Sequence, residues 1–209
     1  MAEAPPRAVI FDIGRVLVKL DLARAAASLS DGLLFGPDEL WSAIQTDPRW
    51  KDWQEGRIAP HDWYLHISKR LGSKLNFAEF RDAWNRTLDP EPLQTRDLFE
   101  ELAKSKRLAL LSNTDPIHVS YLEANYDFFE FFPTAARVYS CSVNASKPSP
   151  AIFRAALDAV RAKAPEAVFI DDIPEYVEAA CGLGLPGIHY QNPLQLRAEL
   201  RALDPRLEI

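Results

Sequence analysis

Cysteine and histidine are scarce in this sequence of 209 residues, which contains two of the first and four of the second. The two cysteines, Cys141 and Cys181, lie too far apart for a CxxC motif, and no histidine pair forms an HExxH motif. The sequence therefore offers no disulfide framework and no recognisable zinc site. We expect two free, buried, reduced thiols.

Long apolar runs and an excess of basic charge are also absent. No apolar stretch reaches about 18 residues, the length needed to span a membrane, and residues 1–7 lack the basic and apolar regions of a signal peptide. The net charge is −6 and the lysines and arginines are scattered, which argues against nucleic acids and anionic membranes as partners. We therefore expect a cytoplasmic protein that acts on a small molecule.

Helical and strand patterns alternate along the second half of the chain. A helix is predicted at residues 93–104, and apolar runs predict buried strands at residues 108–112, 138–142, 167–171 and 187–190. Further helices begin with a capping residue followed by proline, at Asp115, Ser149 and Asn192. Together with a first strand at residues 8–12, this alternation predicts an α/β fold with a Rossmann-like parallel sheet.

Residues 21–88 show helical patterns and no strand pattern. Helices are expected from residue 22 to near Gly32, from residue 37, and over residues 60–71 and 76–88, before the prolines at 90 and 92 end the pattern. We interpret residues 19–92 as an all-helical cap inserted into a core of residues 1–18 and 93–209. The cap is expected to open and close about residues 19–21 and 88–92.

A turn at Gly56 in this cap is flanked by Trp50, Lys51, Trp53 and Arg57. If the turn closes over a site in the core, the aromatic faces suit sugar rings and the cations suit anionic groups. The alternative is that the tryptophans pack the cap helices together, which is the more common use of such residues.

Reactive side chains follow three of the predicted strands. Asp12 ends the first strand, Ser112-Asn113-Thr114 ends the strand at 108–112, and Asp171-Asp172 ends the strand at 167–171. Because the carboxyl ends of parallel strands share one edge of a sheet, these groups should converge, and Lys147 lies in a loop at the same edge. Taken singly, each is explained by a helix cap, a turn or a solvated lysine. Adjacent carboxylates, however, repel each other unless a cation is near.

The chemistry implied by this set is phosphoryl transfer. Asp12 and Asp172 supply hard oxygen ligands for Mg²⁺, and Asp12 can attack phosphorus to form an aspartyl-phosphate. The Ser112 hydroxyl and nearby backbone amides can hold phosphate oxygens. Lys147 can balance the negative charge that builds up in the transition state.

The chain resembles the haloacid dehalogenase superfamily, in particular its Mg²⁺-dependent phosphatases with a helical cap after the first strand. The matching segments are Phe11-Asp12-Ile13-Gly14, Leu111-Ser112-Asn113-Thr114, Lys147-Pro148 and Phe169-Ile170-Asp171-Asp172. The resemblance implies that Asp12 is the nucleophile and that Ser112 and Lys147 bind the phosphoryl group of a phosphomonoester. It implies metal ligation by Asp12, the Gly14 carbonyl and Asp172, with Asp171 ligating directly or through water. Asn113, Thr114 and Arg15 are further candidates for substrate binding.

One position departs from the usual pattern of these phosphatases. They carry a general acid/base Asp two residues after the nucleophile, where this sequence has Gly14. In this respect the chain is similar to the branch that includes bacterial α-D-glucose-1-phosphate phosphatases. Either the leaving group is acidic enough to need little protonation, or another group or water supplies the proton.

Two other functions stay open from the sequence. The first is a metal-independent 2-haloacid dehalogenase, although the adjacent Asp171 and Asp172 argue for a cation. The second is a catalytically weak phosphate-binding protein of the same fold, which the loss of an acid/base at Gly14 would allow.

Overall fold

Five parallel strands form the main sheet of the computed structural model, which describes residues 4–29 and 36–209. Their order is β5-β4-β1-β6-β7, which confirms the predicted parallel α/β core. The bounds are β1 (Ala8–Phe11), β4 (Arg107–Ser112), β5 (Arg137–Tyr139), β6 (Ala167–Asp171) and β7 (Gly187–His189). The predicted end of the first cap helix near Gly32 lies outside the described residues.

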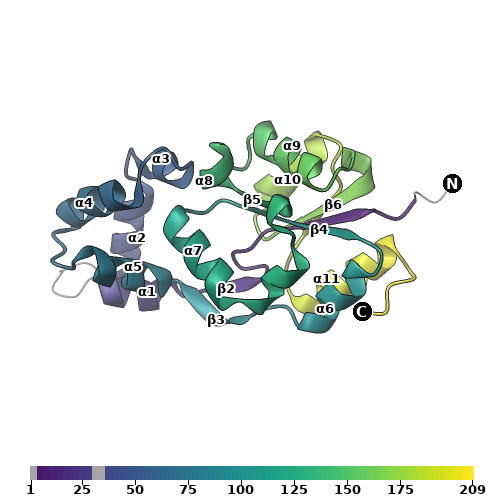
Figure 1. Cartoon of the computed structure of the whole chain (residues 1–209), viewed down its shortest axis with the longest axis horizontal. Helices are drawn as coiled ribbons and strands as arrows, with labels where there is room; N and C mark the ends of the chain where they lie inside the picture. Colours follow the sequence, from purple (N-terminus) through teal and green to yellow (C-terminus); the bar gives the residue numbers. More distant parts are fainter. Residues whose placement is uncertain (1–3, 30–35) are drawn as a thin grey trace.

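The central strand β1 is buried because its side chains alternate between two apolar layers. Val9 and Phe11 pack into the layer formed by α6, α7 and α11, whereas Ala8 and Ile10 pack against α9 and α10 (Figure 1). The helices are α6 (Arg96–Ala103), α7 (Pro116–Asn125), α9 (Pro150–Ala159), α10 (Pro174–Gly182) and α11 (Pro193–Leu203), with 3₁₀ turns at Asp127–Phe131, Thr134–Ala136 and Ala164–Glu166.

The predicted helix caps of the core are present in the structure. Asp115, Ser149 and Asn192 each accept a hydrogen bond from the first turn of the helix that follows, and each is followed by proline. Along residues 4–29 and 36–209, no helix combines the length and the apolar character needed to cross a membrane.

Residues 22–29 and 36–85 form a separate helical layer at one end of the molecule, at the left of Figure 1. We call it the helical insertion. Its helices are α1 (Leu22–Leu29), α2 (Pro37–Gln45), α3 (Trp50–Gln54), α4 (Pro60–Leu71) and α5 (Phe77–Asn85). They enclose their own apolar cluster around Trp53, Trp63 and Trp84, and this cluster also includes Ile117 from α7 of the core. The insertion is therefore packed directly onto the start of α7.

Two short antiparallel strands connect the insertion to the core. They are β2 (Val18–Leu20) and β3 (Leu88–Pro92). The prediction of a helix up to Leu88 followed by a simple break is wrong, because α5 ends at Asn85 and β3 follows. Two prolines fit in this strand because it pairs only with β2, and most of its residues are exposed.

Three smaller predictions are also wrong. The strand expected to reach residue 142 stops at Tyr139, and Ser140–Val143 form the short helix α8. The helix expected from residue 93 begins only at Arg96. Both cysteines are free, but Cys141 is half-buried and Cys181 is exposed, so the expectation of buried thiols fails for Cys181.

Candidate active site

Asp12, Asp171 and Lys147 form a buried charged group at the carboxyl edge of the sheet. The register pairs Phe11 with Ile170, so β1 and β6 deliver Asp12 and Asp171 side by side. The Lys147 ammonium donates to Asp12 Oδ1 at 2.7 Å and to Asp171 Oδ2 at 2.6 Å. Burial disfavours the charged ammonium, but the two carboxylates outweigh it and raise the pKa of Lys147, which stays a cation.

Asp172 completes a cluster of three carboxylates. One oxygen each of Asp12, Asp171 and Asp172 lie within 4.8 Å of one another. Burial, and next the charge of Asp12, raise the pKa values of both Asp171 and Asp172. The structure thus concentrates more negative charge than Lys147 compensates, in the oxygen-rich surroundings that Mg²⁺ prefers.

The contacts of each carboxylate indicate which of the oxygens are free to bind such an ion. Both oxygens of Asp171 have protein partners, since Oδ1 accepts from Ile173 N at 2.8 Å and Oδ2 accepts from Lys147. Among the residues that the structure describes, the Asp172 carboxylate forms one ion pair, a loose one with Arg15 Nη1 at 3.7 Å. The oxygens best placed for a metal therefore belong to Asp12 and Asp172.

The turn after Asp12 keeps the Gly14 carbonyl out of the local hydrogen bonds. Ile13 O accepts from Val18 N at 2.9 Å, and Arg15 N donates to Val18 O at 2.7 Å. These two bonds form the bridge between Gly14 and Val18 without using the Gly14 oxygen. The arrangement is compatible with the metal ligation that the sequence implies for this carbonyl.

The segment Ser112–Thr114 lies at the end of β4, beside the carboxylates. Ser112 is buried and pairs with Tyr139 of β5. Asn113 Nδ2 donates to Lys147 O at 3.0 Å, and Asn113 Oδ1 accepts from Lys147 N at 2.8 Å. Because both ends of this amide hold the backbone of Lys147, Asn113 helps to orient the lysine. The sequence alone did not indicate this contact.

A second group of polar contacts joins the insertion to the loop that carries Lys147. We call Lys51, Glu55, Arg57 and Ser146 the rim cluster. The Glu55 side chain is 3% exposed and pairs with both Lys51 and Arg57. It also accepts from Ser146 Oγ at 2.6 Å, one residue before Lys147. Burial opposes ionisation, but these three donors lower the pKa of Glu55 to about 2.

The backbone of Gly56 fits tightly against the core beside the rim cluster. Its φ is +70°, and a Cβ built on it would lie 2.0 Å from the carbonyl oxygen of Cys141 in α8. Only glycine combines this backbone conformation with such a close approach. The predicted turn at Gly56 is therefore a contact between the insertion and the core.

The tryptophans near this turn differ in burial. Trp53 is fully buried and stacks on Trp63 with 5.5 Å between the ring centroids, so it packs the insertion as the simpler interpretation expected. Trp50 is only half-buried and has tilted contacts with Trp63 and Trp84. Trp50 thus keeps part of its surface available.

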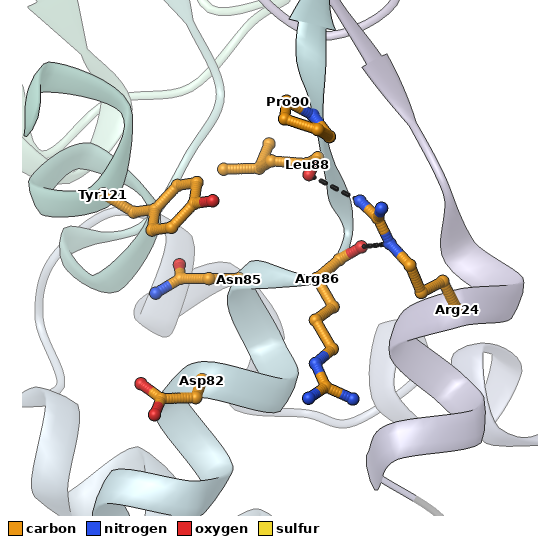
Figure 2. Close-up of a pocket in the computed structure, with 7 residues that line it drawn as sticks. All are labelled: Arg24, Asp82, Asn85, Arg86, Leu88, Pro90 and Tyr121. Atoms are coloured by element: carbon orange, nitrogen blue, oxygen red, sulfur yellow. Dashed lines mark hydrogen bonds between the residues drawn. The ribbon is translucent and has the colours of Figure 1, made fainter. Parts of the chain in front are cut away.

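A surface cavity of about 400 Å³ lies where the insertion meets β3 and α7 (Figure 2). None of the sequence-predicted site residues lines it. At its edge, Arg24 of α1 donates from Nε to Arg86 O at 2.9 Å and from Nη2 to Leu88 O at 2.7 Å. These bonds hold α1 against the segment by which the chain returns to the core. The cavity therefore lies at the connection between the insertion and the core, and the carboxylate cluster does not line it.

Comparison with known proteins places this site in a family context. The haloacid dehalogenase-like hydrolase family matches residues 6–184. D-ribitol-5-phosphate phosphatase of Bacteroides thetaiotaomicron is 26% identical over 200 residues, covering 93% of this chain and 97% of the relative. A sesquiterpene phosphatase of Aspergillus oryzae is 27% identical over 202 residues, covering 94% and 96%. A mutant of a haloacid dehalogenase family enzyme from Bacteroides thetaiotaomicron, solved with magnesium and inorganic phosphate, has a TM-score of 0.80 and 25% identity, with 90% and 95% coverage.

Proposed function

This chain belongs to the haloacid dehalogenase-like hydrolase family, and we propose that Asp12 is the nucleophile with which it hydrolyses a small phosphomonoester. The enzyme is a Mg²⁺-dependent phosphatase. The observation that carries the assignment of Asp12 is the cluster of three carboxylates, in which buried Asp12 and Asp171 share the Lys147 ammonium and Asp172 lies beside them. Two phosphatases among the relatives, aligned over nearly the whole chain, support the same reaction.

The reaction follows from the roles of these side chains. An oxygen of Asp12 bonds to phosphorus while the ester oxygen departs, which leaves an aspartyl-phosphate that water then hydrolyses. Lys147 holds Asp12 in place and offsets negative charge as the phosphoryl group transfers. Asp12, Asp172 and the Gly14 carbonyl would hold Mg²⁺, which would supply positive charge against the phosphate oxygens. In this proposal, the phosphate oxygens also bind to Ser112, to Thr114 and to Arg15.

The departing alcohol receives its proton from water in this proposal. Residue 14 has no side chain to act as general acid, and the nearby Arg15 keeps its proton. A leaving group that is somewhat acidic, such as an anomeric hydroxyl, would react fastest.

We propose that the leaving group is neutral, as in a sugar or polyol phosphate. The sequence suggested that Lys51 and Arg57 bind anionic groups, but both are paired with the buried Glu55. Two relatives named for ribitol phosphate and for sesquiterpenes also act on neutral carbon skeletons. The half-buried face of Trp50 is available to stack on such a group.

The helical insertion acts as the cap of this site in our proposal, and residues 19–92 form the cap domain. The rim cluster supports this role, since it places insertion residues one position from Lys147. The unpaired cysteines suit a reducing cytoplasm, and the net charge of −6 suits a small-molecule substrate better than a nucleic acid.

The test is phosphate release from a panel of sugar, polyol and aryl phosphates, with Mg²⁺ and with chelator. Turnover should require Mg²⁺ and should disappear in Asp12→Asn, which keeps the size of the side chain. Release of phosphate by Asp12→Asn at the wild-type rate would refute the assignment of the nucleophile. Release of halide from 2-haloacids without metal would instead favour the dehalogenase.

A further inference from the structure

Three side chains join the insertion to the segment that follows β4. Asp115 caps α7, since its Oδ1 accepts from Ile117 N at 2.9 Å and from His118 N at 3.0 Å. The other oxygen, Oδ2, accepts from the indole Nε1 of Trp84 in α5 at 3.0 Å. One carboxylate thus caps a core helix and holds a side chain of the insertion.

His118 closes this arrangement. Its ring stacks on Trp84 with 5.7 Å between centroids, its Nδ1 lies 3.1 Å from Asp115 Oδ2, and its Nε2 lies 3.1 Å from Trp84 O. A carbonyl oxygen and an ionised carboxylate can only accept hydrogen bonds. Both ring nitrogens must therefore carry a proton for both contacts to be hydrogen bonds, so the geometry calls for an imidazolium.

The charges around His118 are consistent with that state. The His118 side chain is 13% exposed and the Asp115 side chain 4% exposed, so solvent screens the pair weakly. Burial disfavours the imidazolium, but Asp115 outweighs it and raises the pKa of His118. On α5 the ring meets Trp84, which has no charge. Burial raises the pKa of the nearby Cys141 thiol to about 11, so it is neutral too.

A second contact holds the same segment one residue earlier. Thr114 N donates to Ser140 Oγ at 2.9 Å, and Ser140 Oγ in turn donates to Gln54 O of the insertion at 2.7 Å. Residues 112–115 are therefore tied to the insertion at Thr114 through Ser140 and at Asp115 through Trp84. The position of the insertion and the conformation of this segment cannot change independently.

We propose that His118 is a positioning residue: as a cation between Asp115 and the main chain of Trp84, it docks the insertion onto α7 and thereby orders residues 112–114 for phosphate binding. This inference rests on the phosphatase reaction proposed above. Loss of the His118 proton removes the bond to Trp84 O and weakens docking. The rate of phosphate transfer should then fall at alkaline pH as His118 titrates.

The test uses Asp115→Asn, because the asparagine oxygen can keep the helix cap. Its NH2 group removes the charge that holds the proton on His118, and it also cannot accept from Trp84 Nε1, so the readout is the position of the alkaline limb rather than the absolute rate. The pKa of His118 is measured by NMR from its Cε1–H resonance, assigned with His118→Gln. The kcat/KM for an aryl phosphate is measured from pH 6 to 9 with saturating Mg²⁺. His61→Gln serves as the control, since His61 is an exposed histidine of the insertion.

We expect the pKa of His118 to lie above 6.5 in the wild type and to fall in Asp115→Asn. The alkaline limb of kcat/KM should move to lower pH with it. At pH values above the wild-type pKa, each unit by which the pKa of His118 is lowered should cost about tenfold in kcat/KM. The indole N–H resonance of Trp84 should titrate with the same pKa, which tests docking even if no substrate turns over. A wild-type pKa at or below 6.5, or an alkaline limb that does not move in Asp115→Asn, would overturn the proposal.

Discussion

Replacing Gly14 by aspartate would place a carboxyl group where the related phosphatases carry their general acid, and the structure has room for it. A Cβ at residue 14 would meet Leu20 Cδ1 at 3.4 Å and Asp12 Oδ2 at 3.9 Å. The first contact is with the end of a flexible side chain, and the backbone of Gly14 is outside the left-handed region, so the substitution carries no backbone strain. The new carboxyl would stand beside the nucleophile.

The size of the gain depends on the leaving group. A well-placed general acid contributes about 10²- to 10⁴-fold, or roughly 3 to 5 kcal/mol of barrier. An introduced side chain that displaces Leu20 will realise only part of this, so we expect about tenfold in kcat/KM for an alkyl phosphate. An aryl phosphate expels a phenolate that needs little protonation, so its kcat/KM should stay within about twofold.

The assay compares glycerol phosphate with p-nitrophenyl phosphate in wild type, Gly14→Asp and Gly14→Asn. Asparagine matches aspartate in size and cannot supply the proton, so it controls for changes in packing and in the Gly14 carbonyl. An equal gain in kcat/KM on both substrates, or the same gain in Gly14→Asn, would show that the gain does not come from proton transfer to the leaving group.

Three further predictions follow from the site and the rim cluster. Gly56→Ala should lower kcat/KM at least tenfold, because its Cβ would collide with Cys141 O and push the insertion off α8; unchanged kinetics would mean that the close contact is not needed. Glu55 has a pKa of about 2 against 4.5 unperturbed, so it contributes stability above pH 4.5 that is lost as the pH falls toward 2. Glu55→Gln should lower the free energy of unfolding in urea by roughly 2 kcal/mol at pH 7, a figure reduced because the partners of Glu55 are exposed. The decrease should be smaller at pH 3.5, and an equal decrease at both pH values would contradict this prediction. Lys147→Met leaves Asp12 and Asp171 without their cation, so its melting temperature should fall more without Mg²⁺ than with it, as calorimetry would show.

The core could be predicted from local patterns because its strands are short, apolar and followed by clear helix starts. Because the carboxyl ends of parallel strands lie at the same edge of a sheet, Asp12, Asp171 and Lys147 could be expected to lie close together. The same local approach failed at residues 140–142, which were predicted to continue the strand that ends at Tyr139. There the Ser140 hydroxyl bonds both Thr114 and Gln54, partners that the sequence does not place nearby.

Contacts between the insertion and the core could not be predicted either, because they also join residues that are far apart in the sequence. The three-residue spacing of Asp115 and His118 suggests a pair on one helix face, but Trp84, which explains the pair, is 31 residues before Asp115. Nothing in the sequence around Glu55 indicates that this residue is buried. Its burial and its bond to Ser146, 91 residues away, give it a role at the site.

The charge balance of the carboxylate cluster links metal binding to phosphate binding. Lys147 pairs with Asp12 and Asp171, and the half-exposed Arg15 lies 3.7 Å from Asp172, so one formal negative charge stays uncompensated when all three carboxylates are ionised. Uncompensated charge explains why the pKa values of Asp171 and Asp172 are raised. A phosphate dianion would add to this repulsion, whereas one divalent cation cancels it. The substrate should therefore bind tightly only after Mg²⁺, and its affinity should fall in proportion as the metal is withdrawn.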